Sequence, residues 1–116
     1  MFAPKLVDRL GENVMPDAGK AEGVTGFKRI IDLAAAHGVG FTPHSWSSAI
    51  NTAAAAHLFA SASSGVVFEL KPNPSPMQHE LITDPIGQRD GFVEIPPGLG
   101  LGIGVREDVI GKYLMR

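Results

Sequence analysis

Three ionisable side chains follow short apolar segments of this sequence at nearly equal intervals. Asp17, His44 and Glu69 are separated by 27 and 25 residues, about the length of one strand-helix-strand repeat. A single carboxylate after a strand is more often a cap or a loop residue, but three ionisable residues at the ends of successive strands favour a site. In α/β folds the carboxyl ends of parallel strands meet at one mouth, so we expect these side chains to converge there.

A carboxylate beside a histidine can carry out proton transfer. If Asp17 hydrogen-bonds one imidazole nitrogen of His44, it fixes the tautomer and leaves the other nitrogen basic. We therefore predict Asp17, His44 and Glu69 as catalytic residues. We predict two neighbours as substrate-binding residues. Lys20 holds a substrate anion unless it is a solvated loop cation, and Trp46 lines a pocket unless it only covers a helix end.

Two other patterns predict no site. The glycines at positions 98, 100, 102 and 104 alternate strictly, whereas a dinucleotide-binding loop needs G-x-G-x-x-G between a strand and a helix. We predict a turn-rich extended segment in which two backbones approach closely. The four histidines do not have the spacing of metal ligands, and His57 is predicted to be a core or edge histidine with its hydrogen bonds satisfied.

Hydrophobic periodicity predicts the helices that must position these residues. Apolar side chains recur at helical spacing in residues 24–37, and Gly38 is the expected C-terminal cap. A second helix is predicted from about residue 48 to residue 60, with Ser47 or Ser48 as its N-cap. Its many alanines would let the helix backbone lie close to a sheet.

Three short apolar segments predict strands. Residues 39–42 and 66–70 are typical of strands buried on both faces of a parallel sheet, and residues 13–17 are a third candidate in which Pro16 permits only the edge or end of the sheet. The predicted order in residues 1–70 is therefore βαβαβ with right-handed crossovers.

Residues 71–116 have a different character, because prolines interrupt most of the pattern. Only residues 92–95 and a last helical turn at residues 109–114 are predicted to be regular. The many apolar residues argue against disorder, so we expect a structured segment that wraps over the βα units. Residues 1–116 are then one partial-barrel domain, made of the βα units in 1–70 and the wrapping segment in 71–116.

Composition excludes several classes of protein. The chain has 116 residues, 44% of them hydrophobic, and a formal net charge of -2, which argues against a nucleic-acid partner. It has no cysteine, hence no disulfide framework and no thiolate zinc site. The absence of a basic and apolar leader and of a long apolar run leads us to expect a cytoplasmic protein with no membrane partner.

Four motifs together resemble one known family. The runs VMPDAGKAEGVTG, AHGVGFTPHSWSS, VVFEL and PGLGLGIGVREDVIGKYL occur in this order along nearly the whole chain. They resemble the C-terminal part of the mandelate racemase branch of the enolase superfamily. The resemblance implies an α/β fold, namely strands six to eight of a (β/α)8 TIM-type barrel followed by a Pro/Gly-rich C-terminal wrap.

The resemblance also implies roles for the candidate residues. Asp17 and His44 occupy the positions of a general-base dyad, and Glu69 that of an acid that hydrogen-bonds the substrate carboxylate. The muconate-lactonising and epimerase branches have a lysine at the position of Asp17, which argues against them. Pro43 before His44 and Ser45-Trp46 after it look more like the sugar-acid dehydratases.

In that family magnesium is held by carboxylates on strands three to five, which are not part of this chain. The expected function is therefore that of a fragment of a magnesium-dependent enzyme that abstracts the proton alpha to the carboxylate of a small substrate such as a sugar acid. A dehydratase is the first expectation, and a racemase or epimerase of a 2-hydroxy acid is the alternative. We expect the chain alone to be inactive, because such a proton is too weakly acidic without an electrophile.

An expectation of a different class follows from the open sheet. A parallel sheet without its first strands leaves an unpaired edge and uncovered apolar faces. The chain would then be a catalytically silent half-barrel that associates with itself or with a partner supplying the missing barrel half.

Overall fold

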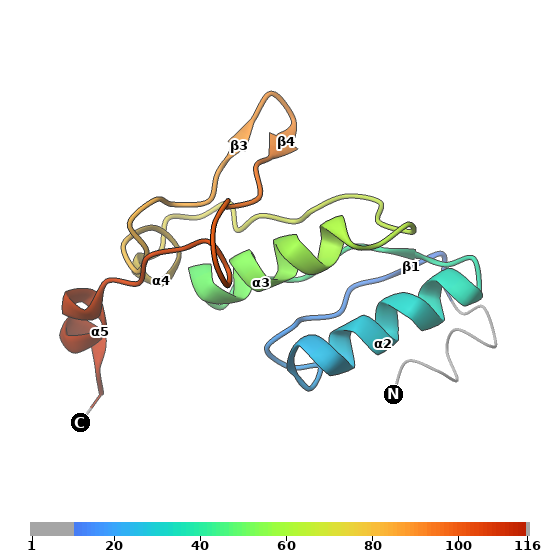
Figure 1. Cartoon of the computed structure of the whole chain (residues 1–116), viewed down its shortest axis with the longest axis horizontal. Coiled ribbons are helices and arrows are strands. Elements are labelled where there is room, and N and C mark those ends of the chain that lie inside the picture. Colours follow the sequence, from blue (N-terminus) through green and yellow to red (C-terminus); the bar gives the residue numbers. More distant parts are fainter. Residues whose placement is uncertain (1–10, 116) are drawn as a thin grey trace.

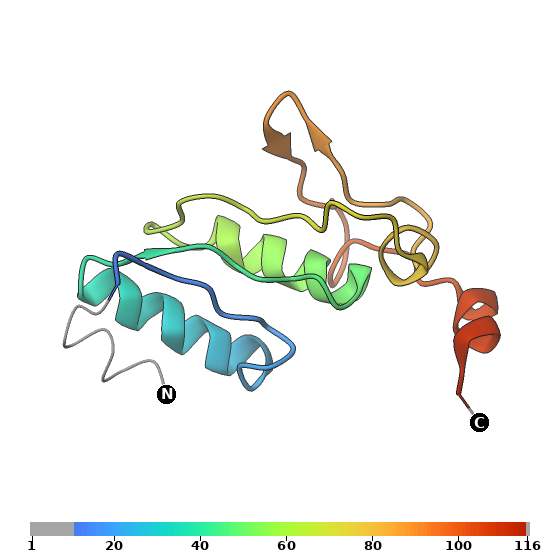
Figure 2. The same ribbon diagram turned by 180° about the vertical axis from the view of Figure 1, so that it is seen from behind.

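Two helices lie side by side on one face of a short parallel sheet in the computed structural model, which describes residues 11–115 (Figures 1 and 2). Strand β1 (Asn13–Val14) pairs with β2 (Gly40–Phe41). Helix α2 (Gly23–Ala36) connects the two strands, and α3 (Ala49–Ala60) follows β2. Residues 1–10 and 116 of the predicted single domain lie outside the described residues.

Helix α2 ends where the sequence predicts. Gly38 has φ +64°, a left-handed conformation that a glycine adopts without strain. Its N–H donates to the Ala35 carbonyl at 3.1 Å, and the Val39 N–H donates to the Ala34 carbonyl at 2.9 Å. Buried Val39 packs against Ala34, which completes a hydrophobic C-terminal cap. The cap turns the chain directly into β2.

Helix α3 begins with the predicted serine cap. The Ser48 side chain accepts a hydrogen bond from the Asn51 backbone N–H at 3.3 Å. Small buried side chains, Ala53, Ala55 and Ala56 among them, occupy more than one side of the helix. They allow α3 to contact α2 on one side and α4 (Pro76–His79) on the other.

The third predicted strand is wrong in length and in burial. Residues 66–70 run beside β2 but form no ladder with it. A single parallel bridge joins Phe41 of β2 to Gly65, just before this segment. Val66 and Val67 are 65% and 58% exposed instead of buried.

Pro43 explains the early end of this pairing. The Phe41 N–H donates to the Ser64 carbonyl at 3.0 Å, and the Val66 N–H donates to the Phe41 carbonyl at 2.9 Å. The next ladder bond would need a donor at residue 43, and proline has no N–H. The chain beyond Val66 therefore follows β2 without a continuous ladder.

Phenylalanine rings form the centre of the core between the sheet and the helices. Phe41 is fully buried and lies 5.9 Å from Phe27 and 5.4 Å from Phe59, measured between ring centroids. Ala18, Ile31 and Leu58 complete this cluster. The core thus joins β2 to both α2 and α3.

Residues 71–115 form a short antiparallel hairpin and two further helices. The hairpin consists of β3 (Gln88–Arg89) and β4 (Phe92–Val93) and projects away from α3 (Figure 1). The positive φ angles of Asp90 and Gly91 match a type I′ turn. The predicted regular segment 92–95 is thus shorter than expected, and the last turn predicted at residues 109–114 overlaps α5 (Glu107–Tyr113), which begins earlier and ends one residue sooner.

The glycine-rich segment has the predicted close backbone approach. Gly98, Gly100 and Gly102 have positive φ angles. A Cβ atom on Gly102 would lie 2.4 Å from the Pro96 carbonyl oxygen, which only glycine avoids. His57 Nε2 donates to the Leu101 carbonyl at 3.2 Å, so this histidine is satisfied as predicted.

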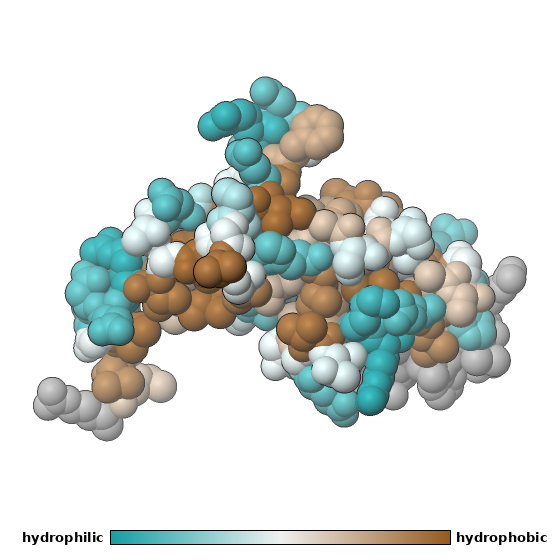
Figure 3. All heavy atoms as spheres, in the orientation of Figure 1, coloured by the Kyte–Doolittle hydropathy of each residue, from teal (hydrophilic) through white to brown (hydrophobic). Residues whose placement is uncertain are grey.

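The surface over α3 and the glycine-rich segment is largely hydrophobic, whereas the hairpin turn and the outer side of α2 are hydrophilic (Figure 3). Within residues 11–115, no helix combines the length and the apolar character needed to span a bilayer.

The Phe41 ring should contribute more to stability than any exposed aromatic ring. Phe41→Ala is expected to lower the free energy of unfolding by about 3–5 kcal/mol, because it leaves a cavity between two other rings. Phe92, which is 78% exposed, is the matched control, and Phe92→Ala should change stability by less than about 0.5 kcal/mol. Chemical unfolding followed by circular dichroism measures both, and equal losses would contradict this account of the core.

Candidate active site

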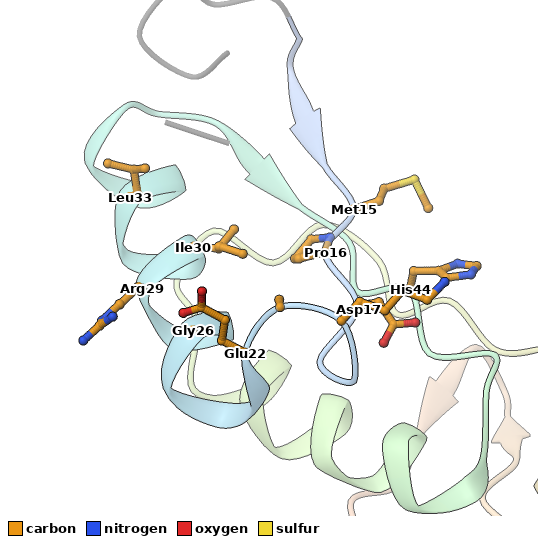
Figure 4. Close-up of a pocket in the computed structure, with 11 residues that line it drawn as sticks. Met15, Pro16, Asp17, Glu22, Gly26, Arg29, Ile30, Leu33 and His44 are labelled. Atoms are coloured by element: carbon orange, nitrogen blue, oxygen red, sulfur yellow. The ribbon is translucent and has the colours of Figure 1, made fainter. Parts of the chain in front are cut away.

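The ends of β1 and β2 bring two predicted catalytic residues side by side. Asp17 and His44 form an isolated parallel bridge just beyond the paired strands. The His44 backbone N–H donates to the Pro16 carbonyl at 2.8 Å, which keeps the two strand ends in register. Figure 4 shows both side chains at the same end of the sheet. The sequence-based expectation of convergence is therefore met for these two residues.

Glu69 joins them from the extended segment that follows α3. Its Oε2 lies 2.8 Å from Nδ1 of His44. The side chains of His44 and Glu69 are 36% and 28% exposed, so both remain accessible to a small molecule. Because a carboxylate only accepts, Nδ1 must carry the proton in this contact. In the neutral ring, Nε2 is then unprotonated and can act as a base.

Asp17 has a different role from the one expected. Its Oδ1 accepts hydrogen bonds from the Gly19 backbone N–H at 2.8 Å and from Asn51 Nδ2 at 3.1 Å. Within the described residues no hydrogen bond joins the Asp17 carboxylate to His44. The expectation that Asp17 fixes the imidazole tautomer is therefore wrong for this structure, because Glu69 holds Nδ1 while a turn amide and α3 hold Asp17.

Sequence reasoning missed Asn51. It lies on the first turn of the helix that follows His44, close to the predicted mouth, and this position is the signal that could have identified it. By holding one carboxylate oxygen of Asp17, Asn51 and the Gly19 amide restrict the orientation of this carboxylate at the strand end beside His44. The first turn of α3 thus belongs to the site.

A cavity of about 700 Å³ opens beside these residues (Figure 4). Asp17, His44 and Lys20 line it together with residues of α2, among them Ile30 and Leu33. The structure therefore places Lys20 at the same opening as the candidate acid and base. Whether Lys20 binds a substrate anion stays a prediction.

Trp46 lies against His44 and does not line this cavity. The two ring centroids are 5.1 Å apart with an interplanar angle of 36°. Trp46 is partly buried, and its Nε1 atom is buried. The indole therefore packs beside the imidazole, and a direct contact of Trp46 with substrate stays a prediction.

The described residues do not fit a magnesium site. Magnesium prefers several carboxylate oxygens and waters in octahedral geometry. Within residues 11–115, no three side chains of His, Asp or Glu gather closely enough to hold a metal ion. Glu69 is engaged by His44, and one oxygen of Asp17 is engaged by two donors.

Comparisons with known proteins identify the family of this chain. The family described as enolase C-terminal domain-like matches residues 1–109. D-galactarolactone cycloisomerase from Agrobacterium fabrum is 28% identical over 110 residues, and D-gluconate dehydratase from Thermoproteus tenax is 32% identical over 109 residues. These matches cover 88% and 93% of this chain but 29% and 22% of the two relatives.

A solved structure adds the fold. The mandelate racemase/muconate lactonizing enzyme-like protein from Rubrobacter xylanophilus superposes with a TM-score of 0.85 at 30% identity, over 99% of this chain and 30% of that protein. The resemblance predicted from four sequence motifs is confirmed, and the chain has the α/β fold of the C-terminal part of a TIM-barrel enzyme.

The contact between His44 and Glu69 predicts an uncommon tautomer. In the unmodified chain, neutral His44 should carry its proton on Nδ1, whereas Glu69→Ala should shift the ring toward protonation at Nε2. Ring ¹⁵N chemical shifts report the change directly. His57 is an internal control, because its Nε2 donates to a carbonyl and its tautomer should be the same in both proteins. An Nε2-protonated His44 in the unmodified chain would refute the assignment.

Proposed function

Because this chain belongs to the enolase C-terminal domain-like family, we propose that it supplies acid and base residues to an enzyme that removes the proton alpha to a carboxylate. The observation that carries the proposal is the 2.8 Å contact between His44 and Glu69 beside Asp17, at the carboxyl ends of parallel strands. In this proposal β1, β2 and residues 65–70 correspond to strands six, seven and eight of a (β/α)8 barrel.

His44 is the base in this proposal. Its Nδ1–H is held by Glu69, so Nε2 is free to accept the proton from the alpha carbon. The negative charge that Glu69 and Asp17 place near the ring stabilises the imidazolium that forms. The same protonated ring can then return the proton to carbon or deliver it to a leaving hydroxyl.

The proposed substrate is a sugar acid, and the proposed reaction is dehydration. Loss of the alpha proton and of the beta hydroxyl releases one water, and the resulting enol becomes a 2-keto-3-deoxy acid. The relative named D-gluconate dehydratase supports this choice, since gluconate is a sugar acid. The residues Pro43, Ser45 and Trp46 around the base support it as well.

Magnesium, which the family implies, would be bound by carboxylates outside the described residues, because residues 11–115 offer no set of three donors. In this proposal the described residues contribute proton transfer. The chain alone is therefore proposed to be inactive.

Isomerisation is the second candidate reaction. The relative named D-galactarolactone cycloisomerase favours it. In this reaction a second base removes the alpha proton from one face of the carbon, and His44 delivers a proton to the opposite face. The enzyme is then a racemase or epimerase of a 2-hydroxy acid.

The candidate of a different class is a catalytically inactive half-barrel that associates with itself or with a partner chain. Met15, Val66 and Val67 are at least half exposed on or beside the strands, and this apolar surface favours a covering partner. Self-association or a second chain with the remaining strands would provide it.

A panel of substrates separates the two reactions. The enzyme that includes this chain should convert a sugar acid such as D-gluconate to a 2-keto-3-deoxy acid, detected as a new 2-keto group by semicarbazide or by mass loss of one water. Loss of optical rotation without a keto product, on a sugar acid or on mandelate, would contradict dehydration and support isomerisation.

Replacement of His44 should strongly slow proton exchange at the face of the substrate that His44 serves. His44→Asn is expected to reduce turnover about 100- to 10,000-fold, because the amide cannot accept the alpha proton. Deuterium incorporation from heavy water measures the exchange step itself, and His79→Asn, at an exposed histidine on α4, is the matched control. If the His44→Asn enzyme exchanged the alpha proton at the unmodified rate with every substrate tried, His44 would be a structural histidine.

A further inference from the structure

We propose that Thr52 and Gln78 are positioning residues that hold His44 and Glu69 in contact. Neither residue lies in a sequence motif that indicates chemistry, and both reach the site from elements outside the strands. The inference rests on the proposed function, because it concerns the base of that reaction. It adds a part of the C-terminal segment to the machinery of proton transfer.

The network centres on the backbone carbonyl of Ser45. Gln78 Nε2 donates to this carbonyl at 3.1 Å, and the Thr52 hydroxyl lies 2.8 Å from it. The same hydroxyl also lies 3.0 Å from Gln78 Oε1 and 3.1 Å from the Ser48 carbonyl. Because it carries one proton, it donates to one of these oxygens at a time, and the Ser45 carbonyl is the nearest of the three. Ser45, Thr52 and Gln78 are all buried. Two donors on one carbonyl use both of its lone pairs and fix the backbone at this point.

Ser45 connects this network to both members of the pair. It follows His44 directly in sequence, so a fixed Ser45 carbonyl also fixes the direction in which the His44 side chain leaves the backbone. The Ser45 hydroxyl donates to the Glu69 backbone carbonyl at 3.3 Å. One residue thus bonds to the segment that carries Glu69 while Thr52 and Gln78 hold its own backbone.

This side-chain network holds the Glu69 segment next to His44, where no strand ladder holds it. Pro43 ends the pairing of residues 66–70 with β2, so the backbone near Glu69 has no continuous ladder to set its distance from His44. The side-chain network supplies that constraint. A displacement of about 1 Å at a reacting group can reduce a rate about 100-fold, so the constraint matters for catalysis and not only for stability.

Two pairs of variants test the proposal. Thr52→Val keeps the shape of the side chain and removes the hydroxyl, whereas Thr52→Ser retains the hydroxyl. Gln78→Met removes both polar groups of a buried glutamine, and Gln88→Met is its control on the exposed strand β3. Ring ¹⁵N shifts of His44 in the chain are the first measurement, and kcat and KM of the enzyme that includes it are the second.

Thr52→Val and Gln78→Met should each lower the fraction of His44 protonated at Nδ1. They should also reduce kcat roughly 10- to 100-fold with a smaller change in KM. Thr52→Ser and Gln88→Met should leave both measurements close to those of the unmodified protein. A cooperative unfolding transition establishes that each variant is folded. If one of the two does not fold, the other still tests the network, because Thr52 and Gln78 both bond to the Ser45 carbonyl. If neither folds, Thr52→Ala and Gln78→Ala remove the same bonds with smaller side chains and should produce the same shift.

The outcomes separate this inference from the function on which it rests. If folded Thr52→Val and Gln78→Met chains keep His44 protonated at Nδ1, the positioning role is refuted whatever the activity. If they shift the tautomer while the His44→Asn enzyme still exchanges the alpha proton normally, the network positions the ring but the proposed function fails.

Discussion

The backbone hydrogen bond from His44 to the Pro16 carbonyl, at 2.8 Å, sets the geometry on which the site depends. It extends the register of β1 and β2 beyond their paired residues and places Asp17 next to His44. The register in turn depends on Phe41, because the buried ring anchors β2 on α2 and α3. Packing in the core thus determines which polar residues meet at the strand ends.

Pro43 determines how the Glu69 segment is held beside His44. Its missing N–H ends the ladder on the side of residues 66–70, and it directly precedes the candidate base. Side-chain bonds then hold Glu69, one from its carboxylate to the ring of His44 and one from its backbone carbonyl to Ser45. Because these bonds replace a backbone ladder, the Glu69 segment is easier to displace than a paired strand.

In the proposed function, the site residues of this chain serve proton transfer. The chain carries a histidine whose free nitrogen is set by Glu69, and a carboxylate, Asp17, held by Asn51. The described residues carry no cluster that fits a metal ion, and the relatives are more than three times as long.

Local interactions made much of this protein predictable. The sequence determined α2 and α3, the Ser48 and Gly38 caps and the glycine turns, because helical periodicity and caps depend on neighbours a few residues apart. The meeting of Asp17 and His44 was predictable for another reason, since both follow neighbouring parallel strands. Only the tertiary structure decided that Glu69 and not Asp17 holds His44, that residues 66–70 leave the sheet, and that Asn51, Thr52 and Gln78 support the site. The contacts of His44 with Glu69 and of Asp17 with Asn51 join residues 25 and 34 positions apart, and their geometry follows from how whole elements pack.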